Sequence, residues 1–283
     1  MVADEGDLTP AATPAPRSVI ELLADSDRPG GFLLLMDRIR QSYVDLDDPT
    51  YLDFEYMQAF ADIVDALADG PLAVTHIGGG ACTFARYIAA TRPGSSQIVL
   101  EPDVALASLV RAQLPFARGA RVRIRPVDGR GGLRELKRGS ADLIVLDAFH
   151  GGRVPPELTT AEFFADAARV LREDGVLLVN VADGPPGTFT RRLAAAVRIS
   201  MPHLLIAGDS SVVRLRRFGN LVLAASARPL PVDAVRTAAA RAMFPRSVLD
   251  GTRLGEFVRS ATPLTDADPM RSPEPPEEMW RVG

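Results

Sequence analysis

The sequence is poor in the residues that build disulfides, metal sites and basic surfaces. Its 283 residues include one cysteine, Cys82, and three histidines, at positions 76, 150 and 203. A single cysteine excludes a disulfide within the chain and a cysteine-based zinc site, and the histidines lack metal-ligand spacing. The formal net charge is −4, which argues against nucleic-acid binding through bulk electrostatics. We therefore expect no metal, no nucleic-acid partner and a reducing compartment.

Long apolar runs are also absent near the N-terminus. The longest run there, FLLLM at 32–36, is far too short to cross a bilayer. The first residues are acidic and rich in proline and alanine, unlike a secretory signal. Hydrophobic residues make up 47% of the chain and charged residues 24%, which is ordinary for a globular protein. We expect a cytoplasmic protein without a membrane partner.

Composition divides the chain into four parts. Residues 1–28 are predicted to be a mostly disordered tail, which could include a short helix at SVIELLAD. Residues 29–48 have apolar residues on both sides of a central Asp-Arg pair, which predicts an N-terminal hairpin. Residues 49–245 carry the main domain, and the proline-rich, acidic segment 246–283 is predicted to be a C-terminal tail.

From residue 72 onward, apolar strands alternate with helical patterns. The strand candidates are 73–77, 97–101, 121–126, 142–147, 175–181, 203–207 and 220–226. Near-continuous apolar strands with helical crossovers predict a parallel sheet covered on both faces. No full helix fits between the last two strands, so we expect an antiparallel pair there. The predicted fold class is α/β, with a Rossmann-like, mostly parallel seven-stranded sheet, an antiparallel last strand, helices on both faces and a short N-terminal hairpin.

Glycines and an acid follow the first two strands of this sheet. The first strand is followed by Gly78, Gly79 and Gly80, which allow a tight turn and a close approach of the backbone to a ligand. Glu101 follows the second strand, about 20 residues further on, where a carboxylate can accept both hydroxyls of a ribose. Ligands of open α/β sheets bind at these carboxyl ends of the strands.

The next two strands also end in polar residues. Asp128 and Gly129 follow the third strand; the acid can accept from an adenine amino group, and the glycine leaves room for the base. Asp147 follows the fourth strand. The four strand ends together predict a pocket for an adenosine-containing ligand. NAD fits less well than S-adenosylmethionine or its decarboxylated form, because GGGACTFA has Thr83 in place of the third glycine of G-x-G-x-x-G.

The order of these segments resembles the spermidine synthases, also called polyamine aminopropyltransferases. The likeness covers residues 31–226 and is carried by HIGGG, IVLEPD, VDGR, DLIVLDAF and EFFADAARVLREDGVLLVN, with LLLMDRIRQSYVDLDDPTYLDFEYM upstream and an echo in LTDADP at 264–269. The resemblance implies the fold of the class I S-adenosylmethionine-dependent methyltransferases for residues 49–245. It also implies decarboxylated S-adenosylmethionine as co-substrate and a small-molecule amine as partner.

The resemblance assigns roles by position. It implies that Gln41 contacts the nucleoside and that Tyr56 lines the substrate channel. Asp147 matches the first acid of the family's DSxDP loop, which helps to deprotonate the attacking amine. The remaining nucleoside contacts fall on Gly78, Gly79, Gly80, Glu101, Asp128 and Gly129.

The chain departs from the family in the half of the pocket that holds the amine. Ala81 stands where the family's GGGDGG loop has an acid that grips the aminopropyl chain. His150 stands where the second acid of DSxDP holds the amine; it is a candidate catalytic base, with a solvated loop histidine as the alternative. GDSSVVRLRRFG replaces the family's P-T-Y-P-S-G, and its arginines could favour an anionic substrate or simply face water. Cys82 follows the glycine loop, where a helix N-terminus could lower a thiol pKa, although we favour simple packing.

Three functions therefore remain open. The preferred one is aminopropyl transfer from decarboxylated S-adenosylmethionine to an amine, in polyamine biosynthesis. The second is methyl transfer from S-adenosylmethionine to an unknown acceptor, because an alanine at position 81 leaves room for the methionine carboxylate. The third is nucleoside binding without catalysis. The family commonly forms dimers or tetramers, so a homodimer is expected.

Overall fold

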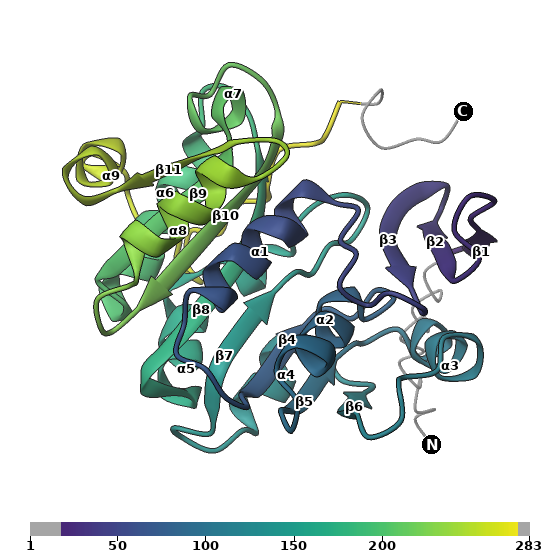
Figure 1. Ribbon diagram of the computed structural model, residues 1–283. Helices are drawn as coiled ribbons and strands as arrows, with labels where there is room; N and C mark the ends of the chain where they lie inside the picture. Colours follow the sequence, from purple (N-terminus) through teal and green to yellow (C-terminus); the bar gives the residue numbers. More distant parts are fainter. Residues whose placement is uncertain (1–17, 277–283) are drawn as a thin grey trace, which may run out of the picture.

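The computed structural model describes residues 18–276, which form a large α/β sheet and a small antiparallel sheet beside it (Figure 1). The large sheet has the strand order β11-β9-β10-β8-β7-β4-β5-β6. Its strands are β4 (Ala73–Ile77), β5 (Ser96–Leu100), β6 (Arg121–Arg125), β7 (Ala141–Leu146), β8 (Leu171–Asp183), β9 (His203–Asp209), β10 (Gly219–Ser226) and β11 (Arg246–Asp250). Strands β4 to β8 pair in parallel, and β10 is antiparallel to both of its neighbours. The predicted α/β class and antiparallel pair are confirmed.

The large sheet has eight strands where the sequence predicts seven. The additional strand, β11, pairs antiparallel with β9 and lies at the start of the segment predicted to be a tail. Its sequence, RSVLD, has only two apolar residues, so periodicity gives little signal. Arg246 at its start is instead held by an ion pair with Asp62 on the distant helix α1 (Glu55–Asp65).

The C-terminal segment stays packed beyond β11. Helix α9 (Gly251–Val258) buries Leu254 and Val258 in the core. The amide of Ala161 donates to the carbonyl of Leu264 at 2.8 Å. The predicted tail at 246–283 is thus part of the fold as far as residue 276, and residues 277–283 lie outside the described part of the chain.

The N-terminal sheet has three strands rather than a hairpin. Strands β2 (Gly31–Met36) and β3 (Ile39–Asp45) form the predicted hairpin, and its two turn residues, Asp37 and Arg38, both have positive φ. Strand β1 (Ile20–Ala24) pairs with β2 inside the segment predicted to be a tail with a short helix. A short apolar run alone does not distinguish a strand from a helix. Here Ile20 and Leu22 pack against the core from an extended strand. The rest of that predicted tail, residues 1–17, lies outside the described residues.

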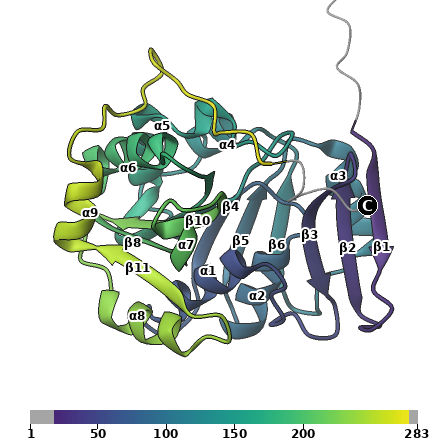
Figure 2. The ribbon, with the colours of Figure 1, turned by 90° about the horizontal axis from the view of Figure 1, so that it is seen from above.

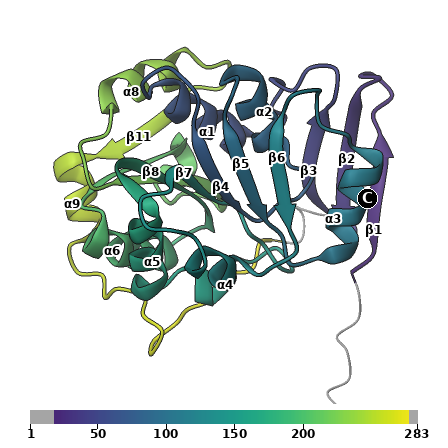
Figure 3. The same cartoon turned by 90° about the horizontal axis from the view of Figure 1, so that it is seen from below.

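Helices cover both faces of the large sheet (Figures 2 and 3). One face carries α1, α2 (Thr83–Thr91) and α8 (Val232–Arg241); the other carries α4 (Gly129–Arg134), α5 (Ala161–Val170), α6 (Thr188–Ser200) and α9. Helix α3 (Val104–Gln113) packs with residues of the N-terminal sheet in a third apolar cluster, and α7 (Ser210–Val213) is a single turn. Within residues 18–276 no helix has the length and apolar character needed to cross a membrane.

Candidate active site

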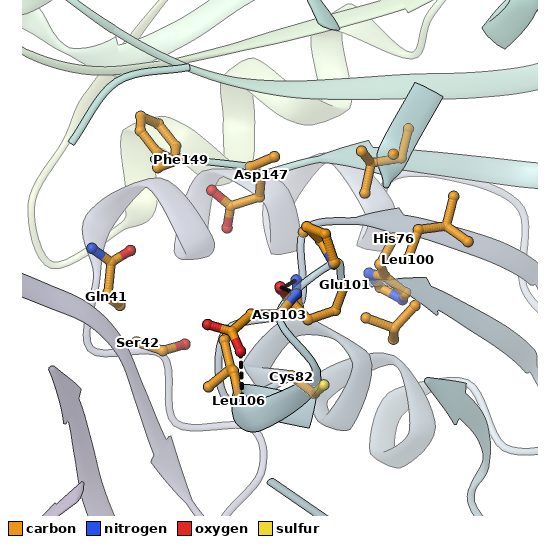
Figure 4. A pocket seen from close by; sticks show the side chains of 18 of the residues that line it. Gln41, Ser42, His76, Cys82, Leu100, Glu101, Asp103, Leu106, Asp147 and Phe149 are labelled. Carbon is orange, nitrogen blue, oxygen red and sulfur yellow. Dashed lines mark hydrogen bonds between the residues drawn. The ribbon is translucent and has the colours of Figure 1, made fainter. Parts of the chain in front are cut away.

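A cavity of about 790 Å³ lies at the carboxyl ends of β4, β5, β6 and β7 (Figure 4). Strand β3 forms the opposite wall of the cavity. Its residues Gln41 and Ser42 face the strand ends of the large sheet. The volume suits a nucleoside-sized ligand. The cavity brings together nine of the ten predicted site residues: Gln41, Gly78, Gly79, Gly80, Glu101, Asp128, Gly129, Asp147 and His150.

Close packing explains two of the glycines at the strand ends. Gly78 has a φ of +94°, and a Cβ there would lie 2.2 Å from the carbonyl oxygen of Asp147. A Cβ on Gly129 would lie 2.4 Å from Cγ2 of Ile77. Asp128 is the N-cap of α4 and accepts from the amide of Gly131 at 2.7 Å. These glycines therefore let the walls of the cavity approach one another.

Replacing Gly78 with alanine should destabilise the fold strongly. The added Cβ would meet backbone, which costs about 1–3 kcal/mol for overpacking, and the left-handed conformation adds roughly 1–2 kcal/mol. Gly119→Ala is the matched control, because Gly119 has a φ of +90° with nothing within 4 Å of its Cβ position. Denaturant unfolding should show the larger loss for Gly78→Ala. Equal losses in the two variants would mean that the close contact with Asp147 is not significant.

Glu101 is fixed beneath the glycine loop. Its side chain is only 8% exposed, and it accepts from the amide of Gly79 and from the amide of Asp103, both at 2.9 Å. Burial raises the pKa of Glu101, while these backbone hydrogen bonds act in the opposite direction. Its carboxylate faces the cavity with acceptor capacity left for a ligand (Figure 4).

Asp147 is held by two donors from different elements. Its Oδ2 accepts from the hydroxyl of Tyr56 at 3.1 Å, and its Oδ1 accepts from the amide of Asn180 at 2.9 Å. Asn220 in turn donates to Oδ1 of Asn180 at 2.8 Å. Burial raises the pKa of Asp147, and no arginine or lysine within the described residues pairs with it. A carboxylate oriented in this way and shifted upward in pKa suits proton transfer better than an ordinary surface acid.

The structure adds two asparagines to the predicted site and places the predicted Tyr56 outside the nucleoside cavity. Tyr56 is not among the residues that line the nucleoside cavity; it lies beside a small pocket of about 30 Å³ and a second chamber of about 430 Å³. Asn180 and Asn220 were not predicted. The available signal was that Asn180 is the single polar residue in the run VLLVNVA. Only the fold shows that it points at Asp147.

The residues at which the chain departs from the family pattern differ in their burial: Ala81 is buried, whereas His150 is exposed. Ala81 is completely buried, so position 81 gives the cavity no carboxylate. His150 is exposed at the rim, and its backbone pairs with that of Arg153. Burial raises the pKa of Cys82 to about 12, the opposite direction to the lowered thiol pKa considered from the sequence. Cys82 therefore packs beneath the loop.

The cavity is lined by negatively charged side chains. Five carboxylates line it: Glu101, Asp103, Asp128, Asp147 and Glu157. No arginine or lysine is among its lining residues in the described part of the chain. His76 is buried against Gln97, and burial lowers its pKa to about 4, so it is neutral at pH 7. The cavity favours a cationic ligand.

The strand order and the position of the cavity define the class: the fold is that of the class I S-adenosylmethionine-dependent methyltransferases. No protein-family model matches the chain. A crystal structure of a probable spermidine synthase from Corynebacterium glutamicum ATCC 13032 is 31% identical, with a TM-score of 0.82, over 91% of this chain and 97% of that chain. The chain belongs to the spermidine synthase, or polyamine aminopropyltransferase, family, as a divergent member.

More distant similarities agree with this placement. The polyamine aminopropyltransferase of Chromobacterium violaceum is 34% identical over 142 residues, and the chain spans about half of that curated relative, 53% of its length. The spermidine synthase of Thermotoga maritima is 16% identical, with a TM-score of 0.58 over 80% of this chain and 76% of that chain, which shows the shared fold.

Proposed function

We propose that the protein transfers an aminopropyl group from decarboxylated S-adenosylmethionine to an amine. The observation that carries this proposal is the acidic cavity, which no arginine or lysine of residues 18–276 lines. Decarboxylated S-adenosylmethionine has a sulfonium and an ammonium group, both positive, which five carboxylates attract. Intact S-adenosylmethionine has in addition a carboxylate, which would enter the same cavity with no cationic partner.

In this proposal, different residues of the cavity bind the ribose, the adenine and the sulfonium end of the co-substrate. Glu101 accepts hydrogen bonds from the ribose hydroxyls, Asp128 accepts from the adenine amino group, and the close approach at Gly129 leaves room for the base. Gln41 contacts the nucleoside from the N-terminal sheet, and the glycine loop lies against its sulfonium end. The size of the cavity, the buried Glu101 and the glycine cradle support this assignment.

Asp147 is the proposed base. When bound, decarboxylated S-adenosylmethionine supplies an electrophilic carbon next to sulfur: the acceptor nitrogen forms a bond to that carbon, the carbon–sulfur bond breaks, and its electron pair remains on sulfur in methylthioadenosine. Asp147 takes the proton that the attacking nitrogen loses and passes it to solvent. Tyr56 and Asn180 hold the carboxylate in place for this step.

Calorimetric titration with decarboxylated S-adenosylmethionine, S-adenosylmethionine and methylthioadenosine tests the proposal. We expect the decarboxylated form to bind more tightly than the intact form by at least about tenfold, or roughly 1.4 kcal/mol. Methylthioadenosine lacks the ammonium group and reports the contribution of the nucleoside alone. Tighter binding of intact S-adenosylmethionine would instead indicate methyl transfer, and no binding of any of the three would reject an S-adenosyl ligand.

A further inference from the structure

Two neighbouring glycines of the cavity loop face different polar side chains. A Cβ on Gly79 would lie 3.1 Å from Oε2 of Glu101, and a Cβ on Gly80 would lie 3.0 Å from Oγ of Ser42. Gly80 has a φ of +48°, a backbone conformation that favours glycine, so this place stays free of a side chain. Ser42 therefore borders the same loop as the proposed ribose acid, one residue further along.

Ser42 is a buried polar residue in the wall that β3 forms. It is 3% exposed, yet it is among the residues that line the cavity. Its side chain is directed from β3 toward the interior of the cavity (Figure 4). The hydroxyl is thus in a place where a bound ligand can reach it and where little bulk water competes.

The proton of the Ser42 hydroxyl is already used within the protein. Thr83 donates its single hydroxyl proton to the carbonyl of Tyr43, at 2.8 Å. The hydroxyl oxygens of Ser42 and Thr83 are 3.1 Å apart, and because Thr83 has no proton left, Ser42 is the donor between them. Ser42 therefore offers the cavity only the lone pairs of its oxygen.

Amides of the glycine loop are also used within the protein. The amide of Gly78 donates to the carbonyl of Leu100 at 3.0 Å, and the amide of Cys82 donates to the carbonyl of Gly79 at 2.7 Å. The amide of Gly79 donates to Glu101. An ammonium group, which has three donors and no acceptor, suits the lone pairs of Ser42, whereas a carboxylate, which only accepts, does not.

We propose that Ser42 is the residue that binds the ammonium group of the co-substrate's aminopropyl chain. This inference rests on the aminopropyl transfer proposed above, in which the glycine loop lies against the sulfonium end. The ammonium group donates to Ser42, Ser42 donates to Thr83, and Thr83 donates to the carbonyl of Tyr43. In intact S-adenosylmethionine the carbon that bears the amino group also bears a carboxylate, which finds no donor on Ser42. Ser42 takes no part in proton transfer.

Four nucleosides separate the ammonium contact from the rest of the ligand. They are decarboxylated S-adenosylmethionine, intact S-adenosylmethionine, methylthioadenosine and the dimethylsulfonium derivative of deoxyadenosine, which keeps the sulfonium but has no ammonium group. Calorimetry should show that Ser42→Ala binds the decarboxylated form about tenfold more weakly, as for one hydrogen bond to a charged group. Binding of methylthioadenosine and of the dimethylsulfonium nucleoside should stay unchanged. Unchanged affinity for the decarboxylated form, or an equal loss for the dimethylsulfonium nucleoside, overturns the inference.

Ser108→Ala is the matched control for Ser42→Ala. Ser108 lines the same cavity, but it is exposed on α3 and donates to the carbonyl of Val104 at 2.7 Å. Its loss should leave the affinity for all four nucleosides unchanged. Equal losses in the two serine variants would overturn the assignment of the ammonium group to Ser42.

Variants of Thr83 test the direction of the hydrogen bonds. Thr83→Val keeps the shape of the side chain but removes the acceptor for Ser42, so the proton of Ser42 can turn toward the ligand. The ratio of the affinities for the decarboxylated and intact forms should then fall several-fold, whereas Thr83→Ser, which keeps the hydroxyl, should retain the wild-type ratio. A loss of the same size for both ligands would indicate a structural role alone and would overturn the inference.

The outcomes separate this inference from the proposed function. If the wild-type protein binds none of the four nucleosides, both fail. If it binds the decarboxylated form without any dependence on Ser42, only the inference fails. If Ser42 selects the ammonium group but no amine causes release of methylthioadenosine, the inference stands and aminopropyl transfer fails.

Discussion

Asp147→Asn is expected to lower kcat by about 10²- to 10⁴-fold, the usual range for loss of a general base. The substitution keeps the size of the side chain and its position at the end of β7, but removes the group that accepts the proton. The affinity for decarboxylated S-adenosylmethionine should fall much less, since other groups hold the ribose and the base. Steady-state kinetics and calorimetry together separate the two effects. A variant that keeps more than about a tenth of the activity would exclude Asp147 as the base.

The pH dependence of the rate gives an independent test of Asp147. The carboxylate must be deprotonated to accept a proton, and burial raises its pKa, so activity should fall on acidification at a higher pH than an ordinary aspartate would give. Tyr56 lowers that pKa by hydrogen bonding to the charged form. Tyr56→Phe should therefore move the acid limb of kcat/KM to still higher pH. A limb that stays in place would show that the carboxylate which controls the rate is not Asp147.

Glu101→Gln is expected to weaken nucleoside binding by about 10- to 100-fold, since hydrogen bonds to a charged group contribute about 1.5–3 kcal/mol. Glu101 is the buried acid of the cavity, and its position at the end of β5 faces the expected place of the ribose. Calorimetric titration with methylthioadenosine isolates this contribution, because that ligand carries neither the sulfonium nor the ammonium group.

Glu157→Gln is the matched control for Glu101. Both acids line the same cavity, and both variants lose one negative charge, but Glu157 is exposed. Thermal unfolding of both variants shows whether the loop contact of Glu101 with Gly79 is also lost. Equal weakening in the two variants would mean that net charge alone attracts the ligand. Unchanged affinity in Glu101→Gln would reject the ribose assignment.

The sequence predicts the residues at the strand ends of the cavity far better than it predicts strand β11 or the hydrogen-bond partners of Asp147. Gly78, Glu101 and Asp147 stand at strand ends, and parallel strands bring such ends together whatever the details of packing. Strand β11 and the contact of Asn180 with Asp147 depend instead on which distant segments meet, and local periodicity does not encode that. The family and the fold class are confirmed, whereas the roles of the individual site residues stay predictions.

The ion pair between Arg246 and Asp62 also bears on the order in which the site can form. It joins residues 184 positions apart, while the nucleoside cavity is lined only by residues between 18 and 158. Contacts of such long sequence separation carry a large loop-closure entropy and form late in folding. During synthesis, the lining of the nucleoside cavity leaves the ribosome long before Arg246. The contact of strand β11 with helix α1 therefore forms only after all residues that line the nucleoside cavity have been synthesised.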